Sequence, residues 1–324
     1  MNLTVSASPH IRGKDTTTRL MLDVVIALLP ALIAGVIVQG LRAALVAAVC
    51  VLSALAGEWL LRLVLRQYNT LPDGSALVTG LLLALTLPAS VPYWTAATGG
   101  LFAAVVVKGI CGGLGQNTFN PALGARAFLM LLFPACLTRF PALGAPLPLG
   151  ELSPVDVITG ATPLHHMQMP ALPDATLADM FLGGIGGCIG ETSALALLIG
   201  GGYLLFRRVI SFRIPAAYLG TVALLALIFP KGEDPLMWMA YSVLGGGVVL
   251  GAVFMATDYA TSPVGSAAQV VYGVGCGVLT MVFRYTGLFP EGVTYAILLM
   301  NASVWLLDKY LVRTQFGGRK ERAA

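Results

Sequence analysis

Two apolar runs in the first part of the chain decide the class of fold. Residues 20–39 read LMLDVVIALLPALIAGVIVQ, and residues 41–65 read LRAALVAAVCVLSALAGEWLLRLVL. Each run is about as long as the ~20 residues that an α-helix needs to cross the ~30 Å hydrocarbon core of a bilayer. The two runs therefore predict two membrane-spanning helices.

Composition extends this prediction to the whole chain. Of the 324 residues, 57% are hydrophobic and 10% are charged, and the mean hydropathy is +0.85. A soluble domain usually carries roughly 25% charged residues, so a soluble core of this size is excluded. The net charge of +4 does not indicate nucleic-acid binding, because the bases are scattered between apolar runs. The five cysteines lie far apart without a C-x-x-C pair, which argues against a disulfide framework or a complete iron–sulfur site.

We expect an all-α polytopic membrane protein of about ten transmembrane helices. The third span has only about 13 residues before Pro88, too few for an upright crossing, so we expect a broken or tilted helix there. The predicted spans are Leu20–Gln39, Leu41–Leu65, Ser75–Leu87, Tyr93–Ile110, Pro121–Leu137, Thr192–Arg207, Ile214–Phe229, Leu236–Ala256, Val264–Tyr285 and Val293–Tyr310.

The distribution of bases predicts the orientation. If ten spans alternate from a cytoplasmic N-terminus, fourteen of the nineteen Lys and Arg residues lie in cytoplasmic segments, Lys108 among them. Four lie on the outer side, namely Arg42, Arg139, Lys231 and Arg284. Arg126 is then the one base inside a span. Because cytoplasmic loops are enriched in Lys and Arg, we expect a bacterial inner-membrane protein with both termini inside.

One long polar segment divides the chain into two halves. We expect a cytoplasmic N-terminal segment (1–19), a first five-span half (20–138), a periplasmic loop (139–191), a second five-span half (192–311) and a basic cytoplasmic tail (312–324). Residues 73–77 (DGSAL) resemble residues 191–195 (ETSAL). With five spans in each half, such a repeat would be inverted.

The periplasmic loop contains the sequence DVITGATPL at residues 156–164. Gly160 permits unusual backbone dihedrals, and Pro163 favours an extended conformation for Thr162. These residues predict a turn that presents the Thr162 hydroxyl with little bulk around it. An ordinary loop turn is the alternative.

The motif and its setting resemble the flavin-attachment site of the D-type subunit of the Rnf electron-transport complex, and of the B-type subunit of the sodium-pumping NADH:quinone reductase. Residues 120–126 (NPALGAR) and 257–263 (TDYATSP) also resemble that family, and the resemblance covers essentially the whole chain. Only about 19 residues precede the first span, which favours the Rnf type.

The resemblance implies that FMN is joined through a phosphoester to Thr162, with Thr159, Gly160 and Ala161 completing the motif. A separate flavin transferase would attach the FMN. The resemblance also implies a second, non-covalent flavin such as riboflavin, but it does not indicate which residues bind it. The chain would be one subunit of a translocase-type oxidoreductase rather than a stand-alone enzyme, with the lipid bilayer and subunits of the A, B, C, E and G types as partners.

Several further residues are candidates for the site. A charge at mid-membrane costs about 2.5–3.5 kcal/mol on insertion scales, so Arg126 should face protein, water or an anionic ligand such as a flavin. Asn120 precedes a helix start that could receive an anion, and Asp156 opens the loop motif. A snorkelling or structurally paired arginine is the alternative for Arg126. Three acidic residues at or near membrane depth are candidates for ion or proton handling: Asp23, Glu58 and Asp258.

The resemblance implies membrane electron transfer between ferredoxin and NAD, coupled to transport of Na⁺ or H⁺. A secondary transporter or channel is the main rival, because a broken span and inverted repeats are typical of that class. A purely structural membrane subunit is the third possibility. Neither rival requires a cofactor on Thr162.

Overall fold

The computed structural model describes residues 16–68, 70–144, 147–150, 160, 162, 164, 167, 173, 175–232, 234–287 and 292–311. This part of the chain is built from helices and contains no β-strand. The elements of the first half are α1 (Thr17–Gln39), α2 (Leu41–Val64), η1 (Leu71–Asp73), α3 (Ser75–Leu85), α4 (Tyr93–Phe102), η2 (Ala103–Ile110), α5 (Pro121–Leu132) and α6 (Pro134–Leu137).

The second half follows the segment that carries the DVITGATPL motif. Its elements are α8 (Leu177–Leu182), η3 (Ile189–Glu191), α9 (Ala194–Phe206), α10 (Arg213–Ile228), α11 (Pro235–Leu244), α12 (Val248–Leu250), η4 (Gly251–Met255), α13 (Ser266–Thr286) and α14 (Val293–Tyr310). Across the two halves, η2 and η4 are π-helical turns, whereas η1 and η3 are 3₁₀ turns.

Each of the ten predicted spans contains helix. Within the described residues, four helices are long and apolar enough to cross a membrane: α1, α2, the α4–η2 helix and α13. A fifth is reached if the bent pair of α11 and α12–η4 is one span. The expected short third helix is confirmed, because α3 has 11 residues and ends before Pro88. The all-helical membrane class is therefore confirmed, while the number ten and the inverted repeat stay predictions.

One predicted span is broken rather than continuous. The segment predicted as Leu236–Ala256 bends by 58° between α11 and α12–η4. Gly246 and Gly247 lie at the break with positive φ values of 64° and 65°. A residue in this left-handed conformation interrupts a regular α-helix, and glycine adopts it at little cost. The two glycines therefore explain the bend. The fifth span is divided in a similar way, with Pro134 starting α6 directly after α5.

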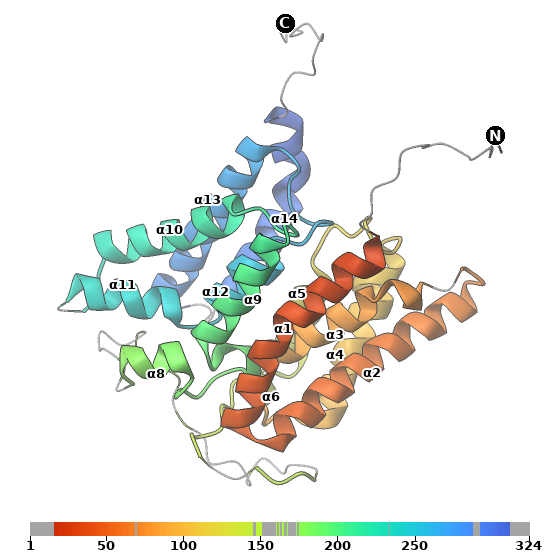
Figure 1. Cartoon of the computed structure of the whole chain (residues 1–324), viewed down its shortest axis with the longest axis horizontal. Helices are drawn as coiled ribbons and strands as arrows, with labels where there is room; N and C mark the ends of the chain where they lie inside the picture. Colours follow the sequence, from red (N-terminus) through yellow and green to blue (C-terminus); the bar gives the residue numbers. More distant parts are fainter. Residues whose placement is uncertain are drawn as a thin grey trace, which may run out of the picture.

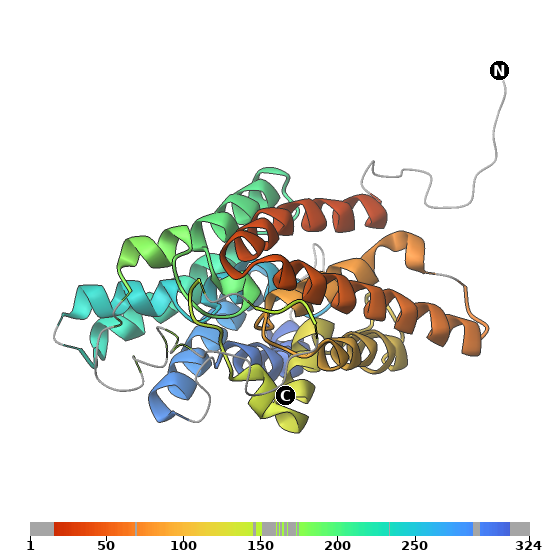
Figure 2. The same ribbon diagram turned by 90° about the horizontal axis from the view of Figure 1, so that it is seen from below.

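The two halves lie side by side, and α1 lies at their border, between α9 and the other helices of the first half (Figures 1 and 2). Helix α1 packs against α9, and the contact is close because a Cβ on Gly200 would lie only 1.9 Å from the Ala27 carbonyl oxygen. Near the start of α1, Asp23 accepts hydrogen bonds from Tyr203 (2.8 Å) and from Arg207 (3.0 Å). The interface between the halves is thus held by both close packing and an ion pair.

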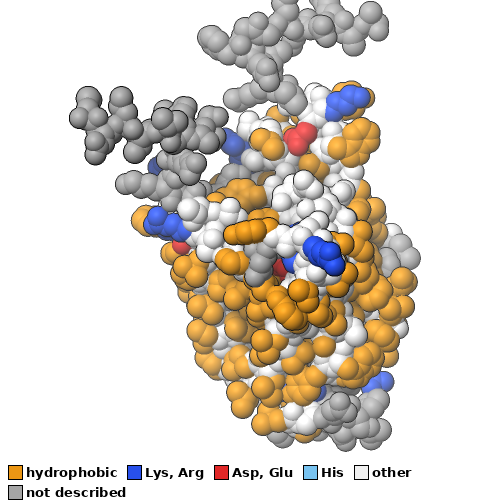
Figure 3. All heavy atoms as spheres, turned by 90° about the vertical axis from the view of Figure 1, so that its right-hand side faces the viewer, with side chains coloured by type: hydrophobic (Ala, Val, Ile, Leu, Met, Phe, Trp, Pro, Cys, Tyr) orange, Lys and Arg blue, Asp and Glu red, His pale blue; other side chains and the backbone are white. Residues whose placement is uncertain are grey.

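The outer surface is strongly apolar. Figure 3 shows one side of the molecule, on which hydrophobic side chains cover most of the middle and lower face and only a few blue Lys and Arg side chains are visible. Large apolar side chains are widely exposed; Ile37 and Leu131, for example, are 78% and 80% exposed. A water-soluble monomer rarely exposes so continuous an apolar surface, and a surface in contact with lipid explains it.

Candidate functional site

The chain around Thr162 is anchored on both sides. The Gly160 N–H donates a hydrogen bond to the Phe140 carbonyl at 3.0 Å, two residues before Thr162. A Cβ on Gly160 would lie 3.2 Å from the Cα of Ala142, so glycine allows this close approach. Two residues after Thr162, the Leu164 side chain is buried. Asp156, Thr159 and Ala161 of the predicted motif lie outside the described residues.

Thr162 lines a cavity of about 650 Å³ beside α5. Ligand pockets in proteins commonly have volumes of about 300–1,000 Å³, so this cavity has the size of a cofactor site. Most of its lining is apolar, and its described polar members include Thr162, Arg126 and Tyr295. The structure therefore brings together two of the predicted site residues, Thr162 and Arg126.

The α5 wall of the cavity carries an aromatic stack and a buried base. Phe128 lines the cavity, and its ring stacks on Phe102 with centroids 3.8 Å apart and planes within 4°. Arg126 is buried on α5, where its Nη2 donates to Cys188 Sγ at 3.5 Å. Tyr295 of α14 also lies within electrostatic reach of Arg126. A guanidinium that is fixed at the edge of an aromatic pocket can bind an anion or stabilise negative charge on a ring.

Asn120 lies at a different cavity. It caps α5, because its Oδ1 accepts hydrogen bonds from the N–H groups of Ala122 (3.0 Å) and Leu123 (3.4 Å). Its Nδ2 donates to the Met255 carbonyl at 3.3 Å, which links α5 to η4 in the second half. Asn120 is not among the described residues that line the Thr162 cavity, and its assignment to the flavin site stays a prediction.

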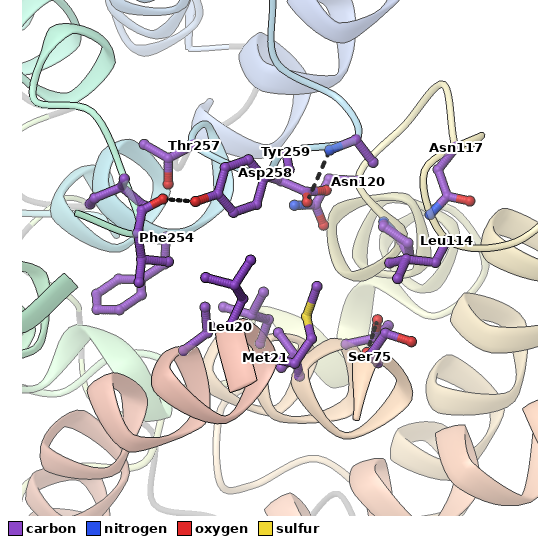
Figure 4. Close-up of a pocket in the computed structure, with 18 of the residues that line it drawn as sticks. Leu20, Met21, Ser75, Leu114, Asn117, Asn120, Phe254, Thr257, Asp258 and Tyr259 are labelled. Atoms are coloured by element: carbon purple, nitrogen blue, oxygen red, sulfur yellow. Dashed lines mark hydrogen bonds between the residues drawn. The ribbon is translucent and has the colours of Figure 1, made fainter. Parts of the chain in front are cut away.

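This second cavity lies between the halves (Figure 4). Figure 4 shows Leu20 and Met21 of α1 below it and Asp258 with Tyr259 above it. Its volume of about 70 Å³ is enough for a few water molecules. The cavity also borders Lys108, so Lys108, Asn120 and Asp258 place polar groups in a mostly apolar lining.

The three acidic candidates have different surroundings. Asp23 is paired with Arg207, as described above. Glu58 is buried and forms an ion pair with Lys108 at 2.8 Å, and it also accepts a hydrogen bond from Thr70 at 2.5 Å. Asp258 follows η4 and lines the second cavity. Two of the three are thus structurally paired, and only Asp258 borders a cavity directly.

Arg126 is not the only base buried among the helices, which corrects the sequence-based view. Arg42, Lys108 and Arg284 are also buried, although the sequence placed them at the membrane faces. Each is stabilised by groups distant in sequence: Arg42 donates to the carbonyls of Pro148 and Gly150, both at 2.6 Å, and Lys108 pairs with Glu58. Arg284 donates to carbonyls at the break after α11.

These features define an all-helical integral membrane protein with a cofactor-sized cavity at the threonine of a conspicuous loop motif. The model of the NQR2, RnfD, RnfE family matches residues 4–317 of the chain. The chain belongs to this family, and the resemblance to the D-type subunit of the Rnf complex is confirmed.

Curated relatives extend over the whole chain. It is 47% identical to the D subunit of the Na⁺-translocating ferredoxin:NAD⁺ oxidoreductase complex of Acetobacterium woodii, over 99% of this chain and 97% of the relative. It is 38% identical to the D subunit of the proton-translocating ferredoxin:NAD⁺ oxidoreductase complex of Clostridium ljungdahlii, over 98% and 97%. It is 39% identical to the D subunit of the ion-translocating oxidoreductase complex of Stutzerimonas stutzeri, over 95% and 94%.

Proposed function

We propose that the chain is the D-type membrane subunit of an Rnf ion-translocating oxidoreductase complex, and that it carries FMN covalently on Thr162. In this proposal it passes electrons within a chain that links ferredoxin and NAD. The observation that supports it best is the position of Thr162 at a cavity of about 650 Å³ with the buried Arg126 in its wall. The names of the relatives support the complex and the reaction but mention no cofactor.

The residues at the cavity have separate tasks in this proposal. Thr162 supplies the oxygen of the phosphoester bond. Phe128 and Phe140 provide apolar surface for the ring system, and Arg126 stabilises negative charge on the phosphate or on the reduced ring. Bound FMN supplies the electron transfer, while the protein orients it and tunes its potential. An alkyl hydroxyl is a poor nucleophile without an adjacent base, so a separate transferase makes the bond.

The proposed partners follow from the relatives, each of which is named as a subunit of a complex. Subunits of the A, B, C, E and G types contact this chain within the bilayer or at its faces. Iron–sulfur and NAD sites belong to those subunits. The coupling ion is Na⁺ or H⁺. Two relatives of comparable coverage are named for different ions, so similarity along the chain does not select one. A second flavin such as riboflavin remains part of the proposal without an assigned site.

Ten spans in two inverted halves, in a bacterial inner membrane with both termini cytoplasmic, complete the proposal. Helix is present in all ten predicted segments, which supports the count. The first residues of α1 and the last residues of α14 lie at the upper side of Figure 1, whereas α8 lies at the lower side. An even number of crossings agrees with this arrangement.

A secondary transporter or channel without a redox cofactor is the rival proposal. The broken helix α11–α12 and a cavity between the halves that includes Lys108, Asn120 and Asp258 are features of that class. Membership of the NQR2, RnfD, RnfE family favours the redox complex. Covalent flavin separates the two proposals, since a transporter has no need of it.

The test is to produce the full chain together with its flavin transferase and to examine it after denaturation in SDS. We expect a fluorescent band under ultraviolet light, because SDS removes only non-covalent flavin. A proteolytic peptide that contains residues 159–163 should carry the mass of FMN less water. A dark band and an unmodified peptide would contradict the proposal and favour the secondary transporter or channel.

A further inference from the structure

Glu191 occupies a niche between two glycines at the junction of the two halves. It ends the η3 turn, directly before α9. A Cβ on Gly247 would lie 2.6 Å from its Oε1, and a Cβ on Gly187 would lie 3.2 Å from its Oε2. The carboxylate therefore fills space that exists because neither neighbour has a side chain.

The backbone of this turn is fixed by the first half of the molecule. The Ile189 N–H donates to the Leu87 carbonyl at 2.9 Å, just beyond α3. Gln39, at the end of α1, donates to the Gly187 carbonyl at 2.9 Å. The Glu191 N–H donates to the Cys188 carbonyl at 3.0 Å. The backbone of the turn that carries Glu191 is thus held by α1 and by the residue that follows α3.

Two buried guanidiniums, those of Arg126 and Arg284, lie near the turn that carries Glu191. A Cβ on Gly246 would lie 2.7 Å from Arg284 Nη2, and a Cβ on the adjacent Gly247 would lie 2.6 Å from Glu191 Oε1, so both side chains meet the same pair of glycines. Arg126 also contacts Cys188, in the same turn as Glu191, and it lines the Thr162 cavity. Two buried positive charges without a nearby negative charge would carry a large desolvation cost, which Glu191 offsets.

Arg284 connects the same carboxylate to the other side of the loop that carries Thr162. It donates to the Ser242 carbonyl at 2.6 Å and to the Gly245 carbonyl at 2.8 Å, at the break after α11. It also lines a small cavity with Leu164 and Met167, which follow Thr162 in sequence. Among the described residues of the loop, Thr162 thus borders the cavity of Arg126 and Leu164 borders that of Arg284, while the turn of Glu191 lies next to both arginines.

We propose that Glu191 is a positioning residue for the flavin site: it draws the Arg126 guanidinium towards the η3 turn and so holds down the reduction potential of a flavin on Thr162. This inference rests on the proposed function. Reduction adds negative charge to the cavity, which a nearby guanidinium favours. Glu191 opposes that effect in two ways, through its own negative charge and by restraining Arg126.

The test compares flavin midpoint potentials by spectroscopic redox titration of the purified complex that contains the full chain. Glu191→Gln keeps the volume that fills the niche but removes the charge, and we expect a more positive potential. Glu191→Asp retains the charge but withdraws it by one methylene, so a smaller shift in the same direction is expected. Asp23→Asn is the matched control, because it removes the charge of another acidic residue that lies close to an arginine. Asp23 lies about 18 Å along α1 from Gly35, which contacts the η3 turn. The variant should therefore leave the flavin midpoint potential unchanged.

A double-mutant cycle tests whether Glu191 acts through Arg126. Arg126→Gln should lower the potential, and in that background Glu191→Gln should give a much smaller shift than in the native chain. An unchanged potential in Glu191→Gln overturns the proposal, and so does a shift no larger than that of Asp23→Asn. An undiminished shift in the Arg126→Gln background overturns the positioning role.

Gel fluorescence separates failure of this inference from failure of the proposed function. If the native chain itself shows no covalent flavin, the proposed function fails. If the native chain is fluorescent but both Glu191 variants are present and dark, Glu191 serves flavin attachment and the positioning role is wrong.

Discussion

In the proposed function, a single hydroxyl group decides whether a flavin is attached covalently at the cavity beside α5. Thr162→Ala removes that oxygen, so we expect complete loss of gel fluorescence while the subunit still accumulates in the membrane. Thr159→Ala is the matched control, because it alters a neighbouring hydroxyl of the same motif and should retain at least part of the flavin. Flavin that survives Thr162→Ala, or that moves to Thr159, would show that the threonine is wrongly assigned.

The buried ion pair of Glu58 and Lys108 predicts an asymmetric response to mutation. Lys108→Leu leaves the Glu58 carboxylate buried without its ammonium partner, and breaking such a pair costs about 3–5 kcal/mol. The double variant Lys108→Leu/Glu58→Leu removes both charges and should recover much of that loss. Thermal unfolding midpoints in detergent measure the effect. Equal midpoints for the single and double variants would contradict this account.

At the residue scale, local patterns predicted the motif but not the charge pairs. Thr162 and Arg126 stand in short recognisable sequences, and the structure brings them to one cavity. Glu58 and Lys108 are 50 positions apart, and neither carries a local signal of its partner. The sequence therefore predicts a cytoplasmic position for Lys108 but not its burial against Glu58. Glu191 was similarly placed at the end of a loop, because only the tertiary fold brings Gly247 against it.

At the element scale, close packing of α1 on α9 predicts different outcomes for two neighbouring glycines. A Cβ on Gly200 would lie 1.9 Å from the backbone oxygen of Ala27, so Gly200→Ala must push the two helices apart. Overpacking of this kind typically costs about 1–3 kcal/mol. A Cβ on Gly202 meets nothing within 4 Å, and Gly202→Ala should be neutral or stabilising by up to about 1 kcal/mol.

The measurement is again the thermal midpoint of each purified variant in the same detergent. A lower midpoint for Gly200→Ala with an unchanged or higher midpoint for Gly202→Ala supports the α1–α9 contact. Similar losses in both variants would mean that α9 is sensitive to alanine for a reason other than this contact.

Element positions were largely predictable because apolar runs end at residues that stop a helix. Gly40 separates α1 from α2, and α3 ends shortly before Pro88. The break after α11 was not predicted, because residues 236–256 form one apolar run and such a run predicts a continuous helix. Three consecutive glycines, 245–247, were the available signal. The two π-helical turns have no comparable signature in the sequence.

At the scale of the whole molecule, the distribution of bases predicts topology. Reporter fusions after Ala171 should report the periplasm, and fusions after Arg213 or Arg319 should report the cytoplasm. Alkaline phosphatase and green fluorescent protein are suitable reporters, because the first is active only outside the cytoplasm and the second folds only inside. A cytoplasmic signal after Ala171 would place the proposed flavin site on the inner face and contradict the assignment.

The ion pair between Asp23 and Arg207 also has a consequence for biogenesis. The two residues are 184 positions apart in the sequence. At about 5–20 residues per second, roughly 10–40 s pass between the synthesis of Asp23 and that of its partner. During that interval the nascent α1 enters the bilayer with an unneutralised carboxyl and without the glycine-lined surface of α9. The first helix therefore completes its packing only after more than half of the polypeptide has left the ribosome, so quality control of the nascent subunit should act on chains arrested before α9.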